Sequence, residues 1–171
     1  MRRFATAMVA VITAAVLAGC SVGGSKVDST TYVGQVGATD YYIAVLTDGH
    51  DVGAYLCDTG AHAFLLHGQV GGHGPIPLVS TNGVHVGDVT IAKGKATGHL
   101  TIGTSTGPFT AELARGHAGY FRNLEQVNGK IVSDSGWIRL NDATVHGAKT
   151  TGGTTVRAGG VQGQQWTDPN V

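Results

Sequence analysis

Turn signals recur at short intervals along this chain and leave room only for short strands between them. They are TDG at 47–49, DTG at 58–60, TNG at 81–83, KG at 93–94, STG at 105–107 and NG at 128–129. The segments between them are rich in β-branched and aromatic residues, and none shows the 3.6-residue apolar spacing of an amphipathic helix. Short strands joined by tight turns pair with their neighbours in sequence. The sequence therefore predicts an all-β antiparallel meander.

Closure of the sheet follows from the number of strands. About eight or nine strands in a meander leave two unpaired edges, which proteins remove by closing the sheet or folding it over itself. We therefore predict that residues 32–148 form one small barrel-like domain, with a two-sheet β-sandwich as the alternative. Residues 149–171 have few apolar side chains. We expect them to form a low-complexity tail, in which Trp166 can dock on the domain.

Hairpin registers can be predicted by asking which pairing separates polar from apolar side chains, because a slip of one residue exchanges the two faces. Asp-Gly is a favoured sequence for a tight primed turn, and Gly at the left-handed position is typical of three-residue loops. The expected pairs are Val45 with Val52 around a two-residue turn at 48–49, Ala54 with Phe64 around a three-residue loop at 58–60, and Thr90 with Thr97 around a two-residue turn at 93–94.

Asp58 is the candidate catalytic residue, because Asp58-Thr59-Gly60 also matches the active-site strand of retroviral-type aspartic proteases. Such an enzyme needs two carboxylates that share a proton, and a homodimer could supply the second. The helix expected downstream has no counterpart, since the segment 100–103 runs into a turn at 104–107. We interpret Asp58 as a turn residue and predict no enzyme; a homodimeric aspartic protease is the alternative.

Histidines and one cysteine are the other chemical candidates. The chain has eight histidines, but none shows the short-range spacing typical of zinc ligands. His67 and His73 flank one loop and are the candidate metal ligands, although we predict no metal site. Cys57 lies in a predicted strand interior without an activating base, so it is expected to be a buried apolar residue. We predict no cofactor.

Two tyrosines are the candidate binding residues. Tyr42 and Tyr55 fall opposite each other on the outer face of the hairpin around the turn at 48–49, and this face is unusually apolar. Either the protein's own chain or a partner covers such a face. The barrel interior could also carry a small hydrophobic ligand, although side chains often fill an eight-stranded barrel.

The N-terminus has the three-part layout of a secretory signal peptide: Arg2 and Arg3, an apolar run, and then small residues. Its end, Leu17-Ala18-Gly19-Cys20, resembles the lipobox of bacterial lipoproteins. The resemblance implies removal of residues 1–19 and attachment of diacylglyceryl and N-acyl chains to Cys20. Residues 20–31 would then be the acylated cysteine and a flexible tether.

Four segments together resemble a group of actinobacterial lipoproteins with a small β-rich domain. They are the lipobox, AYLCD at 54–58, AGYFR at 118–122 and GWIRLND at 136–142. The resemblance implies a lipid-anchored protein on the extracytoplasmic face of the cell membrane, and it implies no reaction or catalytic residue. Without residues 1–19, nine Lys and Arg face eleven Asp and Glu, so nothing attracts nucleic acid. We expect a non-catalytic binding or structural role with a protein or small hydrophobic partner.

Overall fold

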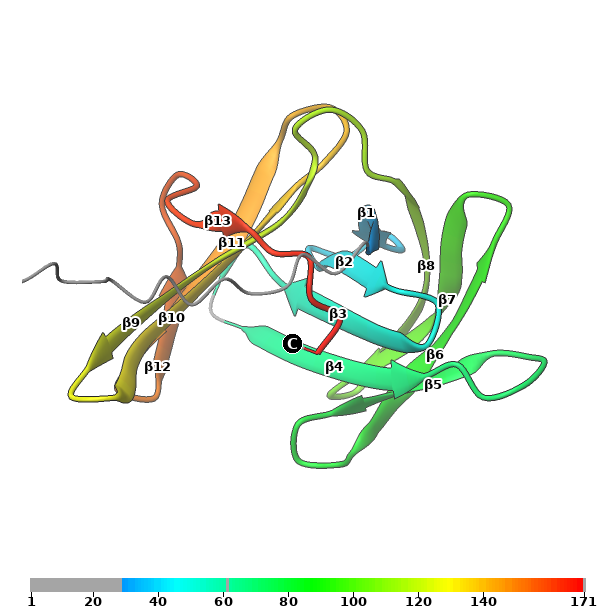
Figure 1. The fold of residues 1–171 in the computed structure, drawn as a ribbon, viewed down its shortest axis with the longest axis horizontal. Helices are drawn as coiled ribbons and strands as arrows, with labels where there is room; N and C mark the ends of the chain where they lie inside the picture. The colour runs from blue at the N-terminus through cyan, green and yellow to red at the C-terminus, as the bar shows by residue number, and fades with distance from the viewer. Residues whose placement is uncertain (1–28, 61, 171) are drawn as a thin grey trace, which may run out of the picture.

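The described chain is built from β-strands, and the first eight close into a barrel (Figure 1). The computed structural model describes residues 29–60 and 62–170, and no helix occurs among them. Each barrel strand pairs antiparallel with the next, and β1 pairs with β8. The strands are β1 (Thr30–Val36), β2 (Tyr42–Thr47), β3 (Asp51–Cys57), β4 (Ala63–Gln69), β5 (Ile76–Ser80), β6 (His85–Ala92), β7 (Lys95–Ile102) and β8 (Ser105–Leu113). The predicted meander that closes into a small barrel is confirmed.

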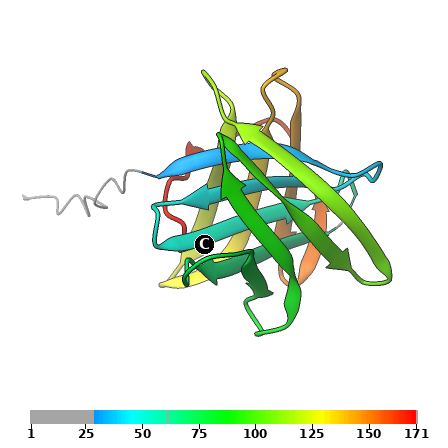
Figure 2. The same cartoon turned by 90° about the vertical axis from the view of Figure 1, so that its right-hand side faces the viewer.

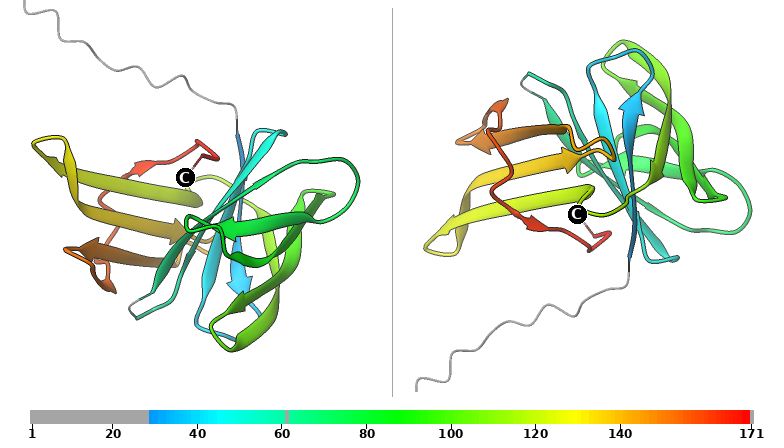
Figure 3. Two further views of the ribbon diagram at one scale, coloured as in Figure 1. Left: turned by 90° about the horizontal axis from the view of Figure 1, so that it is seen from below. Right: turned by 90° about the horizontal axis from the view of Figure 1, so that it is seen from above.

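A second sheet of five strands lies beside the barrel (Figure 3). Its order is β12-β11-β10-β9-β13. The strands are β9 (Gly119–Val127), β10 (Lys130–Arg139), β11 (Val145–Thr151), β12 (Thr154–Arg157) and β13 (Gln164–Gln165). The sequence predicts one barrel-like domain over 32–148 and a tail over 149–171, whereas the barrel ends at Leu113 and the second sheet takes β12 and β13 from the tail. Gly152 and Gly153, with φ of 57° and 82°, form the turn that allows β12 to pair with β11.

The hairpin between β6 and β7 has the predicted register. Thr90 lies opposite Thr97, and Lys93 and Gly94 have φ of 51° and 74°. Positive φ at both central residues is the mark of the primed turn whose twist matches the flanking strands. Figure 2 shows the long green strands of this part of the barrel crossing in front of the cyan strands β2 and β3.

The other two predicted registers are wrong by two residues. Val45 lies opposite Ala54, and Ala54 lies opposite Leu66. Both loops are longer than predicted because an aspartate side chain binds backbone groups that would otherwise belong to the strands. In the first loop Asp48 Oδ1 accepts two backbone N–H groups, at 2.9 and 2.8 Å. A shift of two residues keeps every side chain on its predicted face, so the core positions were nevertheless predicted correctly.

The barrel interior is filled by apolar side chains. Its buried residues include Ile43, Val45, Val52, Leu56, Leu66, Leu78, Val89 and Leu100, each at most 1% exposed. Phe109 and Ala111 from β8 complete the set. This packing occupies the barrel axis, as expected for a barrel of this strand number.

A second apolar cluster joins the barrel to the second sheet. We call it the junction cluster. Its buried members from the barrel are Val33, Ala44, Leu46, Tyr55 and Cys57, and those that follow the barrel are Ala118, Tyr120, Ile138 and Ala148. The apolar outer face of β2 and β3 is thus covered by the protein's own chain.

The C-terminal segment also packs on this side of the molecule. Trp166 contacts the junction cluster, and the Arg122 guanidinium carbon lies 5.1 Å from the centre of its ring. Pro169 lies beside β3, where its carbonyl approaches Gly53 so closely that no side chain would fit there; the red C-terminal segment can be followed to this place in Figure 1. Residues 149–170 are therefore part of the packed structure.

His146 occupies an unusual position at the edge of the junction. Its ring stacks on Tyr42 with ring centres 3.4 Å apart and planes at 7°. Its Nδ1 is buried and has no hydrogen-bond partner within the described residues. Burial lowers the pKa of His146, and Arg157 lowers it further, while Asp142 opposes the shift.

The lowered pKa of His146 predicts a loss of stability in mild acid. The unfolded chain binds the proton more readily than the folded one, so stability is complete above the unfolded pKa of about 6.5 and falls as the pH drops below it. His146→Phe keeps the stacked ring and removes the titrating group. Urea unfolding between about pH 7 and pH 5 should therefore show a shallower loss of stability for His146→Phe than for the natural protein. Equal slopes would contradict this role of His146.

Candidate functional site

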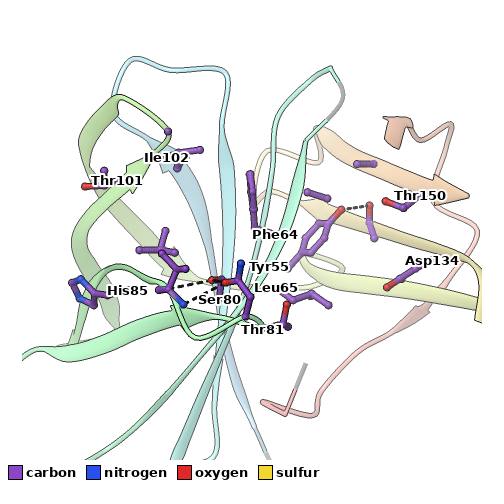
Figure 4. A pocket seen from close by; sticks show the side chains of 17 residues that line it. Tyr55, Phe64, Leu65, Ser80, Thr81, His85, Thr101, Ile102, Asp134 and Thr150 are labelled. Atoms are coloured by element: carbon purple, nitrogen blue, oxygen red, sulfur yellow. Dashed lines mark hydrogen bonds between the residues drawn. The ribbon is translucent and has the colours of Figure 1, made fainter. Parts of the chain in front are cut away.

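A groove of about 640 Å³ lies where the barrel mouth meets the second sheet (Figure 4). We call it the junction groove. Three barrel segments line it, 63–65 in β4, 80–86 around the turn between β5 and β6, and 101–103 at the end of β7, together with Tyr55 of β3; the second sheet contributes positions 134, 136, 148 and 150. Its volume falls in the usual range for ligand-binding pockets.

The groove opens because β4 and β5 separate after a very short contact. Their ladder consists of two residue pairs, Leu66 with Ser80 and His67 with Val79. On one side the ladder ends at Pro77. The backbone of Pro77, like that of Val79, is directed toward β4, but proline has no N–H to donate. On the other side the chain turns away at once, and the N–H of Ser80 donates to the carbonyl of Val84 at 2.9 Å.

The separation leaves a free backbone edge on β4. Backbone groups alternate sides along an antiparallel strand, and the N–H of Val70 donates to the carbonyl of His50 beside β3 at 2.8 Å. Even-numbered residues of this strand therefore direct their N–H and C=O groups toward β3, and odd-numbered residues direct them toward β5. Since the β5 ladder ends at Leu66, the N–H and C=O of Ala63 and the N–H of Leu65 have no strand partner in the described part of the chain.

One wall of the groove is apolar. Phe64, Val86 and Ile102 are partly buried and pack against the barrel core, and all three line the groove. Figure 4 shows Phe64 and Ile102 on the barrel side, with His85 nearby. Val84 at the rim is 58% exposed. Because this apolar wall is open to water, covering it with apolar groups of a ligand would be favourable in free energy.

The opposite wall is more polar and belongs largely to the second sheet. Asp134 is held by Arg122 through two hydrogen bonds, Nε to Oδ1 at 3.1 Å and Nη2 to Oδ2 at 2.8 Å. The hydroxyl of Tyr55 donates to the carbonyl of Gly136 at 3.1 Å, and burial raises the pKa of Tyr55. The Asp134 carboxylate is thus paired with Arg122, and the Tyr55 hydroxyl stays protonated.

Asp58 lies outside the groove, in the turn between β3 and β4. Its Oδ1 accepts the backbone N–H groups of Gly60 and His62, both at 2.9 Å, and its Oδ2 lies 2.7 Å from His62 Nδ1. Partial burial raises the pKa of Asp58, but the hydrogen bonds from His62 and Gly60 outweigh it and hold that pKa below its ordinary value. Both carboxylate oxygens are thus used in stabilising the turn.

The two candidate binding tyrosines are occupied by contacts within the protein. Tyr42 stacks on His146, and the Tyr55 ring lies 4.7 Å from that of Tyr120. Tyr55 is only 4% exposed, although one side of it lines the groove. Tyr55 therefore contributes to the floor of the groove rather than to an open surface.

The remaining candidates are separated from one another. His67 is exposed on β4, and His73 is exposed in the following loop. Among residues 29–60 and 62–170, no three His, Cys, Asp or Glu side chains come together as metal ligands. Cys57 is fully buried, and this burial, followed by the charge of Asp58, raises the pKa of its thiol to about 12. A thiol in this state is a poor nucleophile.

The expectations for the N-terminus fall on residues that the structure does not describe. The signal peptide over 1–19, Cys20 and all but the last residues of the tether lie outside the described ranges. Within those ranges, no helix is long and apolar enough to span a membrane.

Comparisons of the chain with family models, with curated proteins and with solved structures give no match. Fold and site together define the class: a small barrel with an appended sheet and a groove between them.

Several groove residues were not among the candidates taken from the sequence. The turn at 80–84 was recognised only as a turn, and Asp134 and Thr150 lie far from it in sequence. One signal was available. Pro77, inside the run IPLVS at 76–80, is typical of a strand whose ladder is interrupted. The second wall had no comparable signal, because it depends on how two sheets pack.

Proposed function

We propose that this chain is a lipid-anchored protein of the extracytoplasmic face of the cell membrane, which binds a ligand or partner without catalysis. The observation that carries the binding role is the junction groove, with an apolar wall on the barrel side and a polar wall on the second sheet. The anchoring role is supported by the lipobox-like sequence ending at Cys20. Because side chains fill the barrel interior, we propose the groove, and not the interior, as the binding place.

The binding role can be tested by photolabelling of the full chain in lipid nanodiscs with an aliphatic diazirine probe. We expect adducts to concentrate at 63–65, 84–86 and 101–102. Val84→Asp should reduce labelling of these segments about tenfold, because it places a charge at the apolar rim. Val127→Asp is the matched control, since Val127 is 56% exposed and Val84 is 58% exposed, and Val127 does not line the groove.

Two results would overturn the binding proposal. Adducts spread evenly over the surface would show that the groove does not attract the probe. Equal labelling of the two variants would show that labelling does not depend on the rim.

The alternative, a homodimeric aspartic protease, rests on the sequence around Asp58 alone. The carboxylate of Asp58 is 15% exposed and bound within its turn. We expect no cleavage of casein by the purified protein. Cleavage that Asp58→Asn abolishes would replace our proposal with the protease.

A further inference from the structure

The free edge of β4 indicates what kind of ligand the groove takes. We propose that the junction groove binds an extended peptide segment of another protein, which adds to the barrel as an antiparallel strand beside Ala63 and Leu65. This proposal rests on the binding role proposed above and names the ligand class. Addition of a strand to an exposed sheet edge is a recurring mode of peptide recognition.

Backbone groups supply the first part of this recognition. Ala63 directs both its N–H and its C=O away from β3, so one ligand residue opposite Ala63 can exchange two hydrogen bonds with it. The N–H of Leu65 offers a third bond on the same side. A small apolar molecule would cover these groups without pairing them, which costs about 1–3 kcal/mol for each buried group left unsatisfied. A peptide backbone satisfies them.

The two walls supply the second part. Side chains of a strand alternate between the two faces of the sheet, and an added strand beside β4 would share the two faces of that strand. Its inward side chains would meet the barrel-side wall of Phe64, Val86 and Ile102, and its outward side chains would meet the second sheet at Asp134 and Thr150. Since Arg122 already neutralises Asp134, the outer wall favours small polar side chains over a strong charge. The expected ligand alternates apolar and small polar residues.

The shape of the groove favours a peptide over a second copy of this chain. The free edge of β4 is recessed between the turn at 80–84 and the second sheet, which both line the groove. Two copies that approach each other would bring these flanking walls into collision before their β4 edges could pair. A single flexible strand meets no such obstacle.

The test is a selection of short random peptides, displayed on phage, against the full chain in nanodiscs. We expect enriched peptides to alternate apolar and polar residues and to reduce the diazirine labelling of 63–65. Each enriched peptide is then synthesised in two N-methylated forms, with alternate amides blocked. Methylation on the edge that pairs with β4 should weaken binding about tenfold or more, whereas methylation on the other edge should change it by about twofold at most.

A matched pair of variants tests the same bonds from the protein side. Ala63→Pro removes the N–H that points into the groove, at an edge position where proline is tolerated. Ala63→Val keeps that N–H and adds a side chain similar in size to that of proline. We expect Ala63→Pro to bind the peptide about tenfold more weakly than Ala63→Val does. If Ala63→Pro fails to fold, the methylated peptides still decide the question.

Four results would overturn the proposal. They are a failure to enrich any peptide, equal binding of the two methylated forms, equal binding to both Ala63 variants, and self-association of the chain that Ala63→Pro abolishes. If diazirine labelling of the groove persists in these cases, the groove still binds a ligand and only the peptide class is lost. If labelling is also absent, the binding role itself is lost.

Discussion

Replacing Tyr55 with alanine is expected to lower the free energy of unfolding by about 3–5 kcal/mol, the usual cost of removing a buried aromatic ring. Tyr55 stands at the centre of the junction cluster, where it stacks on Tyr120 and donates its hydroxyl to Gly136. The absence of a side chain at Gly136 is required, because a Cβ there would lie 2.5 Å from Cζ of the Tyr55 ring. Loss of the ring would therefore leave a cavity between the barrel and the second sheet.

Urea unfolding followed by tryptophan fluorescence measures this effect directly. Trp137 lies in β10 and Trp166 follows β13, so both report on the second sheet and its surroundings. Tyr55→Phe is the control: it keeps the ring and loses one hydrogen bond, so it should cost about 1 kcal/mol. A loss below about 1 kcal/mol for Tyr55→Ala would mean that the second sheet does not depend on this contact.

Turn chemistry explains how much of the fold could be predicted. Lys93-Gly94 and Asn128-Gly129 adopt positive φ at both positions, so local sequence alone sets these hairpins. Asp48 and Asp58 instead capture backbone N–H groups with their carboxylates, which lengthens the loops. The sequence does not tell a tight primed turn from a longer loop at such a position, because Asp is favoured in both.

The second sheet could not be predicted in the same way. Gly152 and Gly153 carried a signal for a primed turn, but the flanking segments are polar and lack the alternation of a half-buried strand. The pairing of β12 with β11 depends on the junction cluster. That cluster brings Val33 of β1 together with Ile138 of β10. Contacts so distant in sequence leave no local pattern, and the groove between the two sheets was hidden for the same reason.

The proposed lipid anchor at Cys20 can be tested by replacing that cysteine. If Cys20 is acylated, Cys20→Ser should abolish incorporation of an alkyne-labelled fatty acid, because serine offers no thiol. Two or more acyl chains hold a protein stably on a membrane, whereas one holds it only reversibly. The intact mass should show the natural chain beginning at Cys20 with its lipid, and the variant unlipidated and still carrying residues 1–19. Mass and label are the deciding measurements, because the retained apolar run from Phe4 to Val16 can itself associate with a membrane.

Cys57→Ala is the matched control, since Cys57 is the only other cysteine in the chain. Its thiol is fully buried, and burial raises its pKa to about 12, so neither an acyl donor nor an enzyme can reach a reactive thiolate there. We expect Cys57→Ala to keep the full fatty-acid label. Label that survives Cys20→Ser and disappears in Cys57→Ala would contradict anchoring at Cys20, and it would require the junction cluster to open, because Cys57 is fully buried within it.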